Sequence, residues 1–293
     1  MSGSVAVIGF GLMGEVFARR LLDAGFAVAG FDVAPARRAR LAEIGGRPAE
    51  SVADAIAGAQ AILIAVFSTD QVEDVVENHV LPAAGEGSGR IVLCSSTCDP
   101  DRLAALAARV IPRGIRFLEV PVSGTSAQVR NGDGVVLIGG DRALAREVEP
   151  ILDALFARRF HVGKVGDGGR AKLAVNLILG VNRLALAEGL AFAERLGLDA
   201  KTFLEVARGS ASYSQVMDTK GLKMVNRDFA PEGRVRQTLK DAHLMLQQAA
   251  AKGQALPALQ AHAEVLEACV AAGEADLDNS AIIEEIRRRR RLS

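Results

Sequence analysis

Aromatic residues are scarce in this chain of 293 residues, and it carries no net charge. It has no tryptophan and a single tyrosine, Tyr213, so we do not expect the stacked aromatic platform that binds single-stranded nucleic acid. Its 35 basic residues balance its 35 acidic residues, which leaves no bulk attraction toward nucleic acid or an anionic membrane. We interpret the basic end Arg287–Arg291 as a solvated tail, so no nucleic-acid partner is expected.

Cysteine is also rare, and uninterrupted apolar runs are short. Cys94, Cys98 and Cys269 form no Cys-x-x-Cys pair and no cluster of ligands, so we expect reduced, buried thiols, a cytoplasmic protein and no metal site. No uninterrupted apolar stretch approaches the length of a membrane span, so no membrane partner is expected. The apolar start SVAVIGFGLMG has no basic segment before it, so we do not expect it to be a secretory signal.

The first half of the chain alternates short apolar runs with helical patterns. Strands are predicted at 5–9, 26–32, 61–67, 90–96, 115–121, 134–140 and 159–163, with helical segments such as 12–24 and 35–45 between most of them. Alternation of this kind, with strands that are apolar throughout, is typical of a mostly parallel sheet covered by helices on both faces. The fold class predicted for this half is therefore a Rossmann-type, doubly wound α/β sheet.

The strand pattern stops after about residue 164. Helices are predicted at 168–196, 199–208, 213–226, 236–252, 256–272 and 279–291. The segment 168–196 is apolar nearly all round and should be buried on most sides. We therefore predict two domains, an α/β domain at 1–163 and an all-α domain at 164–293, joined by this long helix.

A glycine motif lies between the first predicted strand and the first predicted helix. It reads Gly-x-Gly-x-x-Gly and comprises Gly9, Phe10, Gly11, Leu12, Met13 and Gly14. Glycines at these positions allow a tight turn, a close approach of the backbone to a pyrophosphate, and close packing of helix on strand. The helix that follows offers free N–H groups and a positive dipole end to phosphates. The sequence therefore predicts a dinucleotide site.

Asp32 ends the next predicted strand, 18 positions after Gly14. Its carboxylate can accept hydrogen bonds from the adenosine ribose, and its charge would repel a 2′-phosphate. We therefore expect NAD rather than NADP. Arg37 and Arg38 could reach a 2′-phosphate, but we interpret them as solvated helix charges.

Two further motifs carry polar groups at unusual places. The turn PVSGT after the predicted strand 115–121 offers the hydroxyl of Ser123 and the backbone N–H groups of Gly124 and Thr125, which a carboxylate could approach. At the start of the long apolar helix, GRAKLAVN sets Lys172 and Asn176 four residues apart, so both lie on one helix face. A lysine among apolar residues is unfavourable unless it is paired or functional.

Together and in this order, GFGLMG, PVSGT, GRAKLAVN and LKDAHLML (239–246) resemble the β-hydroxyacid dehydrogenase family. The resemblance covers residues 4 to 286 and implies an NAD(P)-dependent oxidoreductase of small 3-hydroxy acids and their semialdehydes. It implies a Rossmann domain for NAD at 1–163, and a helical domain at 164–293 for substrate binding and for assembly into a homodimer or homotetramer.

The resemblance also implies roles for single residues. Lys172 is the implied general acid/base, which takes the hydroxyl proton during oxidation and returns it during reduction. Asn176 orients the substrate, and Ser123, Gly124 and Thr125 bind its carboxylate. The implied cofactor contacts outside the glycine loop and Asp32 are Val66, Phe67, Thr97 and Lys240.

The chain departs from the family pattern at several positions. Phe67-Ser68 replaces the common Leu-Pro, and Thr125 replaces a glycine. Arg234 and Arg236 are unusual where they stand; we interpret them as surface charges that could also bind an extra anionic group of the substrate. By helical periodicity, Arg183 lies on the same face of the long helix as Lys172 and Asn176. We favour a role for Arg183 in packing or in an ion pair over contact with the substrate. These changes leave the identity of the substrate open.

Two alternative functions remain. Imine reductases have the same architecture but generally carry Asp or Tyr where this chain has Lys172. A catalytically silent NAD-binding sensor or scaffold would have no use for Lys172, Asn176 and Ser123 together.

Overall fold

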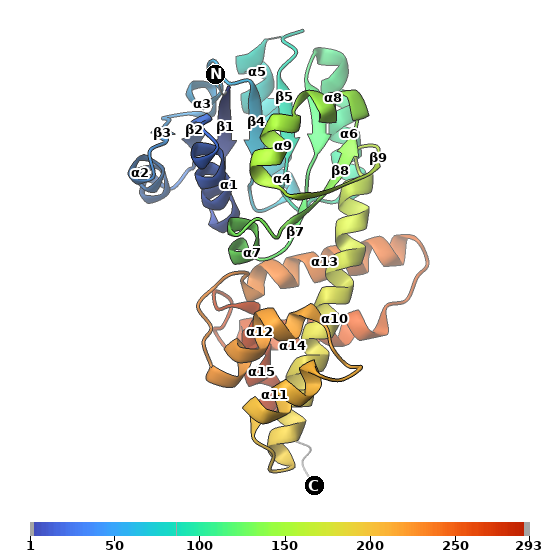
Figure 1. Ribbon diagram of the computed structural model, residues 1–293. Coiled ribbons are helices and arrows are strands. Elements are labelled where there is room, and N and C mark those ends of the chain that lie inside the picture. The colour runs from blue at the N-terminus through green and yellow to red at the C-terminus, as the bar shows by residue number, and fades with distance from the viewer. Residues whose placement is uncertain (1–2, 86, 290–293) are drawn as a thin grey trace. The chain divides into compact units, whose positions relative to one another are not determined.

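The computed structural model describes residues 3–85 and 87–289. The chain divides into two compact units, Met1–Lys172 and Leu173–Ser293. The first unit contains a β-sheet with helices packed on it, and the second is built from helices (Figure 1). The α/β fold followed by an all-α region is therefore confirmed, and one long helix, α10 (Asp167–Arg195), runs from the first unit into the second.

The sheet of the first unit is mostly parallel. Its strands run in the order β3-β2-β1-β4-β5-β6-β8-β7, and β9 pairs with β8. The strands are β1 (Ser4–Ile8), β2 (Ala27–Phe31), β3 (Arg47–Pro48), β4 (Ala61–Ile64), β5 (Ile91–Cys94), β6 (Arg116–Glu119), β7 (Val122–Ser123), β8 (Val135–Gly140) and β9 (Arg158–Gly163). Strand β8 is antiparallel to both β6 and β7, and the other pairs are parallel. The order reverses direction between β1 and β4, which is where ligands bind in sheets of this type.

Apolar strands let this sheet bury both of its faces. Successive side chains of a strand point to opposite faces, so Val5 and Val7 of β1 join one core while Ala6 and Ile8 join the other. The helices of this unit are α1 (Leu12–Asp23), α2 (Pro35–Glu43), α3 (Val52–Ile56), α4 (Thr69–Asp74), α5 (Leu81–Ala84), α6 (Pro100–Val110), α7 (Ser126–Arg130), α8 (Arg142–Glu147) and α9 (Glu149–Leu155), with a π-helical segment at Val75–Val80 and a 3-10 turn at Ile111–Arg113.

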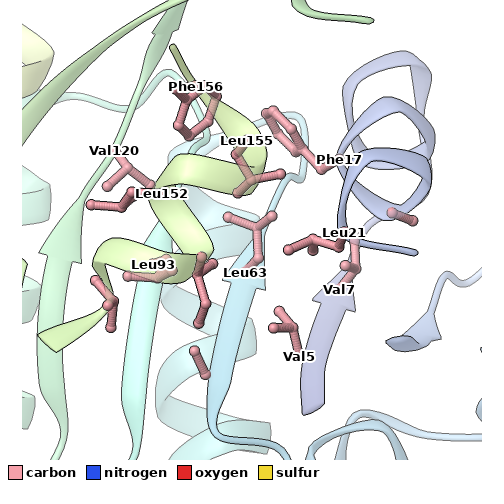
Figure 2. Packing of buried hydrophobic residues seen from close by; sticks show 14 of the residues in the cluster. Val5, Val7, Phe17, Leu21, Leu63, Leu93, Val120, Leu152, Leu155 and Phe156 are labelled. Carbon is pink, nitrogen blue, oxygen red and sulfur yellow. The ribbon is translucent and has the colours of Figure 1, made fainter. Parts of the chain in front are cut away.

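Helices α1 and α9 cover the same core face. Figure 2 shows Phe17 of α1 and Leu152 of α9 above Leu63 and Leu93 of the central strands. The rings of Phe17 and Phe156 meet edge to face, with 5.7 Å between their centroids. Each fully buried side chain of this size contributes about 1.5–3 kcal/mol, so this packing holds the glycine loop that precedes α1 against a firm base.

The second unit packs its helices around a core of their own. Besides the later part of α10 it contains α11 (Ala200–Arg208), α12 (Gln215–Asn226), α13 (Val235–Ala251), α14 (Pro257–Ala271) and α15 (Ile282–Arg288). Its core is formed by apolar side chains that include Leu190, Met224 and Leu266. Within the described residues, α10 alone is long and apolar enough to cross a membrane. Only 33% of its apolar segment is buried inside the protein, so the prediction that this helix is buried on most sides was wrong.

The C-terminal segment differs from the sequence interpretation both in its secondary structure and in the contacts of its arginines. The segment predicted as one helix at 279–291 begins with a 3-10 turn, Asn279–Ala281, and continues as α15. Arg287 pairs with Glu194 and Glu284. Arg288 pairs with Glu274 and Glu285, and Arg289 also pairs with Glu285. These three arginines are therefore part of a charge network rather than a solvated tail; Arg290 and Arg291 lie outside the described residues.

Candidate active site

The glycine loop between β1 and α1 leaves no room for side chains at two of its positions. Gly9 has φ +91°, and a Cβ there would lie 2.6 Å from the backbone oxygen of Ala65. A Cβ at Gly14 would lie 2.0 Å from the backbone oxygen of Gly9. Packing inside the protein therefore explains these two glycines, which let α1 approach β1 and β4 closely.

Packing does not explain the middle glycine. No atom from the described part of the chain lies within 4 Å of the position that a Cβ on Gly11 would take. Gly11 is also the N-cap residue of α1, and no side chain that the structure describes caps this helix end. The loop thus presents bare backbone and a positive helix end to open space, and these features fit the pyrophosphate of a dinucleotide.

Asp32 fixes this loop from the end of β2. Its carboxylate is 5% exposed and accepts hydrogen bonds from the backbone N–H groups of Phe10, at 2.7 Å, and Ala34, at 2.9 Å. Arg37 lies 3.2 Å from the same carboxylate. Arg38 donates to the Asp32 backbone carbonyl and lies over the ring of Phe31. Arg37 is half exposed, as expected of a solvated helix charge, but it also pairs with Asp32. For Arg38 the interpretation as a solvated helix charge was wrong, because its side chain is 21% exposed and lies against the predicted ribose-binding segment.

The remaining cofactor residues of the first unit follow the carboxyl ends of neighbouring strands. Val66 and Phe67 come after β4, and Thr97 comes after β5. The N–H of Val66 donates to the hydroxyl of Ser96, at 2.9 Å, which ties these two strand ends together. The carboxyl ends of β1, β2, β4 and β5 lie at one edge of the sheet, so the loops that follow them line the same edge.

The turn after β6 differs from the sequence interpretation, in which the N–H groups of both Gly124 and Thr125 were available to a carboxylate. Ser123 lies in the two-residue strand β7, and Gly124 has φ +143°. Thr125 is the N-cap of α7 and forms a capping box with Gln128: its hydroxyl accepts from the N–H of Gln128, and its own N–H donates to the Gln128 side chain at 2.9 Å. One of the N–H groups predicted to bind a carboxylate is therefore already engaged by Gln128.

Lys172 is buried, at 7% exposure, in the first turns of α10. A second buried charged residue of this region, Glu119 at the end of β6, was missed by the sequence interpretation. The backbone N–H of Gly166 donates to its carboxylate at 2.8 Å, and the N–H groups of Gly168 and Gly169 also hydrogen bond to it. Burial raises the pKa of Glu119 to about 7, although these N–H groups and the charge of Arg170 act to lower it.

In the second unit the structure brings Asn176 and Lys240 together through Asp241. The Asn176 amide donates to one Asp241 oxygen at 3.2 Å, and the Lys240 ammonium lies 3.1 Å from the other. Asp241, 7% exposed, follows Lys240 directly in the motif LKD. Its role as a link between α10 and α13 was not predicted, because the contact spans 65 residues.

The three remaining arginines singled out from the sequence, Arg183, Arg234 and Arg236, all lie in the second unit. Arg234 and Arg236 are partly exposed and pair with Asp276. Within the described residues, the Nε and Nη1 atoms of Arg183 are buried without a hydrogen-bond partner, as is the Nε atom of Arg234. Burial lowers the pKa of Arg183 to about 10, and burial together with the charge of Arg183 lowers the pKa of His262 to about 3.

The first unit has a glycine loop for a dinucleotide on a doubly wound sheet, and a buried lysine at its end in the first turns of α10. Together with the helical unit that follows, this is the arrangement of a nicotinamide-dependent oxidoreductase. Comparison with family models agrees. Residues 4–163 match the NAD-binding domain of 6-phosphogluconate dehydrogenase, and residues 166–286 match the NAD-binding domain of NADP-dependent 3-hydroxyisobutyrate dehydrogenase.

Curated proteins and solved structures give the same result over nearly the whole chain. Glyoxylate/succinic semialdehyde reductase 1 of Arabidopsis thaliana is 31% identical over 97% of this chain and 98% of its own length. L-threonate dehydrogenase of Cupriavidus necator is 30% identical over 97% and 96%. The crystal structure of 3-hydroxyisobutyrate dehydrogenase from Salmonella typhimurium is 28% identical, covers 97% of this chain and 99% of its own, and superposes with a TM-score of 0.87. This chain belongs to the β-hydroxyacid dehydrogenase family and is an NAD(P)-dependent oxidoreductase that acts on CH–OH groups.

Proposed function

We propose that this enzyme interconverts a small 3-hydroxy acid and its semialdehyde or keto acid, with Lys172 as general acid/base and with NAD as the preferred cofactor. The observation that carries the proposal is the buried position of Lys172 at the start of α10, in a chain that also has the dinucleotide loop. Burial removes the amino group from bulk water, which is the setting in which lysines serve as acids and bases in catalysis.

A nicotinamide cofactor held by the glycine loop and Asp32 would supply the hydride chemistry of the proposed reaction. Neutral Lys172 takes the hydroxyl proton of the substrate during oxidation. In the reverse direction its ammonium group donates that proton to the oxygen on which negative charge develops. Asn176, one helical turn further along α10, would hydrogen bond the substrate oxygen and orient it, while its amide group is itself held by Asp241.

The substrate carboxylate would be bound by the turn at Ser123, Gly124 and Thr125. The positive φ of Gly124 favours an anion there, and the Thr125 N–H could contribute only after it is released from Gln128. The cofactor would contact the glycine loop (Gly9, Phe10, Gly11, Leu12, Met13 and Gly14), Asp32, Val66, Phe67, Thr97 and Lys240. The preference for NAD follows from the charge of Asp32, which would repel a 2′-phosphate.

The substrate class is narrowed by what the relatives are named for. Those proteins act on glyoxylate or succinic semialdehyde, on L-threonate and on 3-hydroxyisobutyrate. All of these are small carboxylates with a hydroxyl or aldehyde group close by. We propose a substrate of the same size and charge.

The helical region at 164–293 would bind substrate and join the copies of a homodimer or homotetramer. Apolar side chains on the surface of α10 support the assembly: Ile178 is 59% exposed and Phe192 is 64% exposed. Side chains of this size, when they remain exposed on a helix, are typical of surfaces that associate.

The test is turnover on a panel of small hydroxy acids with NAD and with NADP, followed by the absorbance of the reduced nicotinamide. The panel contains 3-hydroxyisobutyrate, glycerate, 3-hydroxypropionate, serine, threonate and tartrate, and it is run in reduction with succinic semialdehyde and glyoxylate. We expect Lys172→Ala to lower kcat at least ~100-fold, the low end of a general-base effect, and to bind NADH as wild type does.

Turnover by Lys172→Ala at the wild-type rate would contradict the assignment of the acid/base. Failure of the whole panel, with NADH still bound, would favour the catalytically silent sensor instead. An imine reductase would reduce a cyclic imine rather than these acids, so one such imine is included as a negative control.

A further inference from the structure

The first turn of α10 depends on a residue that is distant in sequence. The first N–H groups of any α-helix lack partners within the helix, and most helices satisfy them with a nearby Ser, Thr, Asp or Asn side chain. Here the acceptor is the carboxylate of Glu119, which lies 47 residues before Gly166. Glu119 therefore joins the carboxyl end of β6 to the start of α10.

Three glycines make the room for this carboxylate. A Cβ on Gly139 or Gly168 would lie 2.8 Å or 2.9 Å from one oxygen of Glu119, and a Cβ on Gly169 would lie 2.7 Å from the other. Contacts below 3.0 Å are shorter than side chains tolerate, so a larger residue at Gly169 would displace the carboxylate. A larger residue at Gly139 or Gly168 would also clash with the backbone oxygen of Lys164 or Leu137. β8 supplies Gly139, the partner of Glu119 in the sheet, so the pocket is enclosed by β6, β8 and α10.

We propose that Glu119 is a positioning residue for Lys172: it fixes the first turn of α10 and thereby determines where the lysine side chain stands during proton transfer. Lys172 follows Gly169 by three residues, less than one helical turn. The inference rests on the proposed role of Lys172. A displacement of about 1 Å in a reacting group can lower a rate about 100-fold, so a loosened helix start is sufficient to matter.

The proposal predicts a distinct pH profile. Burial raises the pKa of Glu119 to about 7, so lower pH protonates the carboxyl and removes one of its acceptor sites. In the reduction direction Lys172 must carry its proton, and acid conditions cannot remove it. A loss of kcat as pH falls through about 7 would therefore come from another group, and we assign it to Glu119.

Other charged or titratable groups lie around this carboxylate. They are Asp167 and Arg170 on α10, Lys164 before it, Asp101 of α6, which pairs with Arg170, and Cys94, the partner of Glu119 on β5. None of these acids and bases has an ordinary pKa between 6 and 8. His161 of β9 lies close by as well, because its Nε2 is 2.8 Å from the backbone oxygen of Gly140, next to Gly139. Histidine side chains ordinarily have a pKa near 6.5, so the acid limb belongs to Glu119 only if Glu119→Gln removes it.

The experiment compares four variants with wild type in the reduction direction from pH 5.5 to 9. Glu119→Gln removes the charge but keeps the size, and Gly169→Ala displaces the same carboxylate while raising helix propensity. Lys172→Ala tests the proposed function. Asp141→Asn is the matched control, because Asp141 caps α8 in the same unit and contacts no site residue named above.

We expect kcat of Glu119→Gln and Gly169→Ala to fall about 10- to 100-fold. NADH affinity, measured by nicotinamide fluorescence, should remain at the wild-type value, and the acid limb should disappear in Glu119→Gln. The solvent deuterium isotope effect on kcat should increase in both variants, because proton transfer becomes slower. Asp141→Asn should keep the wild-type kcat and pH profile.

Wild-type kcat and pH dependence in Glu119→Gln would overturn the proposal. It would also fail if Glu119→Gln lost thermal stability and NADH binding in proportion to kcat, since Glu119 would then act only in folding. An active Lys172→Ala is a separate result, because it removes the proposed acid/base whatever the Glu119 variants do.

Discussion

The choice between NAD and NADP is predicted to depend on the charge of Asp32. At a separation of about 4 Å and an effective dielectric constant of about 20, two unit charges interact by about 4 kcal/mol. A phosphate monoester carries a charge of about −1.5 to −2, so the repulsion from Asp32 would be at least this large without compensation. Arg37 provides compensation, because its guanidinium lies 3.2 Å from the same carboxylate and is half exposed.

We expect a net preference of about 1.5–3 kcal/mol for NAD, which is roughly a 10- to 100-fold ratio of kcat/KM. Asp32→Asn keeps the size of the side chain and removes the charge, so the ratio should fall by most of that factor. Arg37→Ala leaves the carboxylate uncompensated, so it should weaken NADP further and raise the ratio. The opposite directions distinguish an electrostatic effect from general damage to the loop.

The assay measures kcat/KM with both cofactors, and the affinities for NADH and NADPH by nicotinamide fluorescence. The affinity measurement is needed because Asp32 also accepts the N–H groups of Phe10 and Ala34, and its loss could slow turnover for structural reasons. If both variants shift the ratio in the same direction, or if Asp32→Asn leaves it unchanged, the carboxylate does not determine the cofactor.

Two further predictions concern other contacts. Gln128→Ala should lower KM for the hydroxy acid about 3- to 10-fold with little change in kcat, because it releases the Thr125 N–H to donate a charge-assisted hydrogen bond to the substrate carboxylate. A raised KM would mean that the capping box is needed to hold the turn. Lys220→Met should lower the free energy of unfolding in urea by about 3–5 kcal/mol, because it removes the ammonium group that lies 2.9 Å from the fully buried carboxylate of Asp278 and leaves that charge to backbone N–H groups and the Ser280 hydroxyl. An effect below about 1 kcal/mol would refute this.

Local pattern was sufficient to predict most elements of the fold. The strands of the parallel core are apolar on both faces, so β1, β4 and β5 stand out from the helices between them. The two-residue strands β3 and β7 were not predicted, because each is a short segment held only by its neighbour in the sheet. The 3-10 turn before α15 was missed for a related reason: the Asp278 side chain ends the preceding loop and caps the turn.

In the candidate site, too, the residues that a local pattern defines could be predicted, and the roles that depend on contacts between distant segments could not. Gly9 and Gly14 could be predicted because the backbone packing within one loop requires them, and Gly11 because the spacing of the motif reserves its position for a ligand. The capping box of Thr125 and Gln128 was also present as a pattern, Thr-x-x-Gln before a short helix, but the resemblance to a carboxylate-binding turn led to the other interpretation. The roles of Arg37 and Arg38 required knowing that the start of α2 lies against the end of β2.

The burial of Glu119 could not be predicted from the sequence, because its hydrogen-bond donors lie 47 residues or more further along the chain. An acidic residue in the middle of FLEVP suggests a strand that reaches the surface, whereas the side chain is 1% exposed. The compensation comes from N–H groups on another element, and the space comes from glycines at 139, 168 and 169 that look like ordinary turn residues. A buried charge is tolerated only where such partners converge, so Glu119 and the glycines around it must be kept together. A Glu119→Gln loss of kcat that Gly169→Ala reproduces would demonstrate this dependence, since the two changes share only the carboxylate between them.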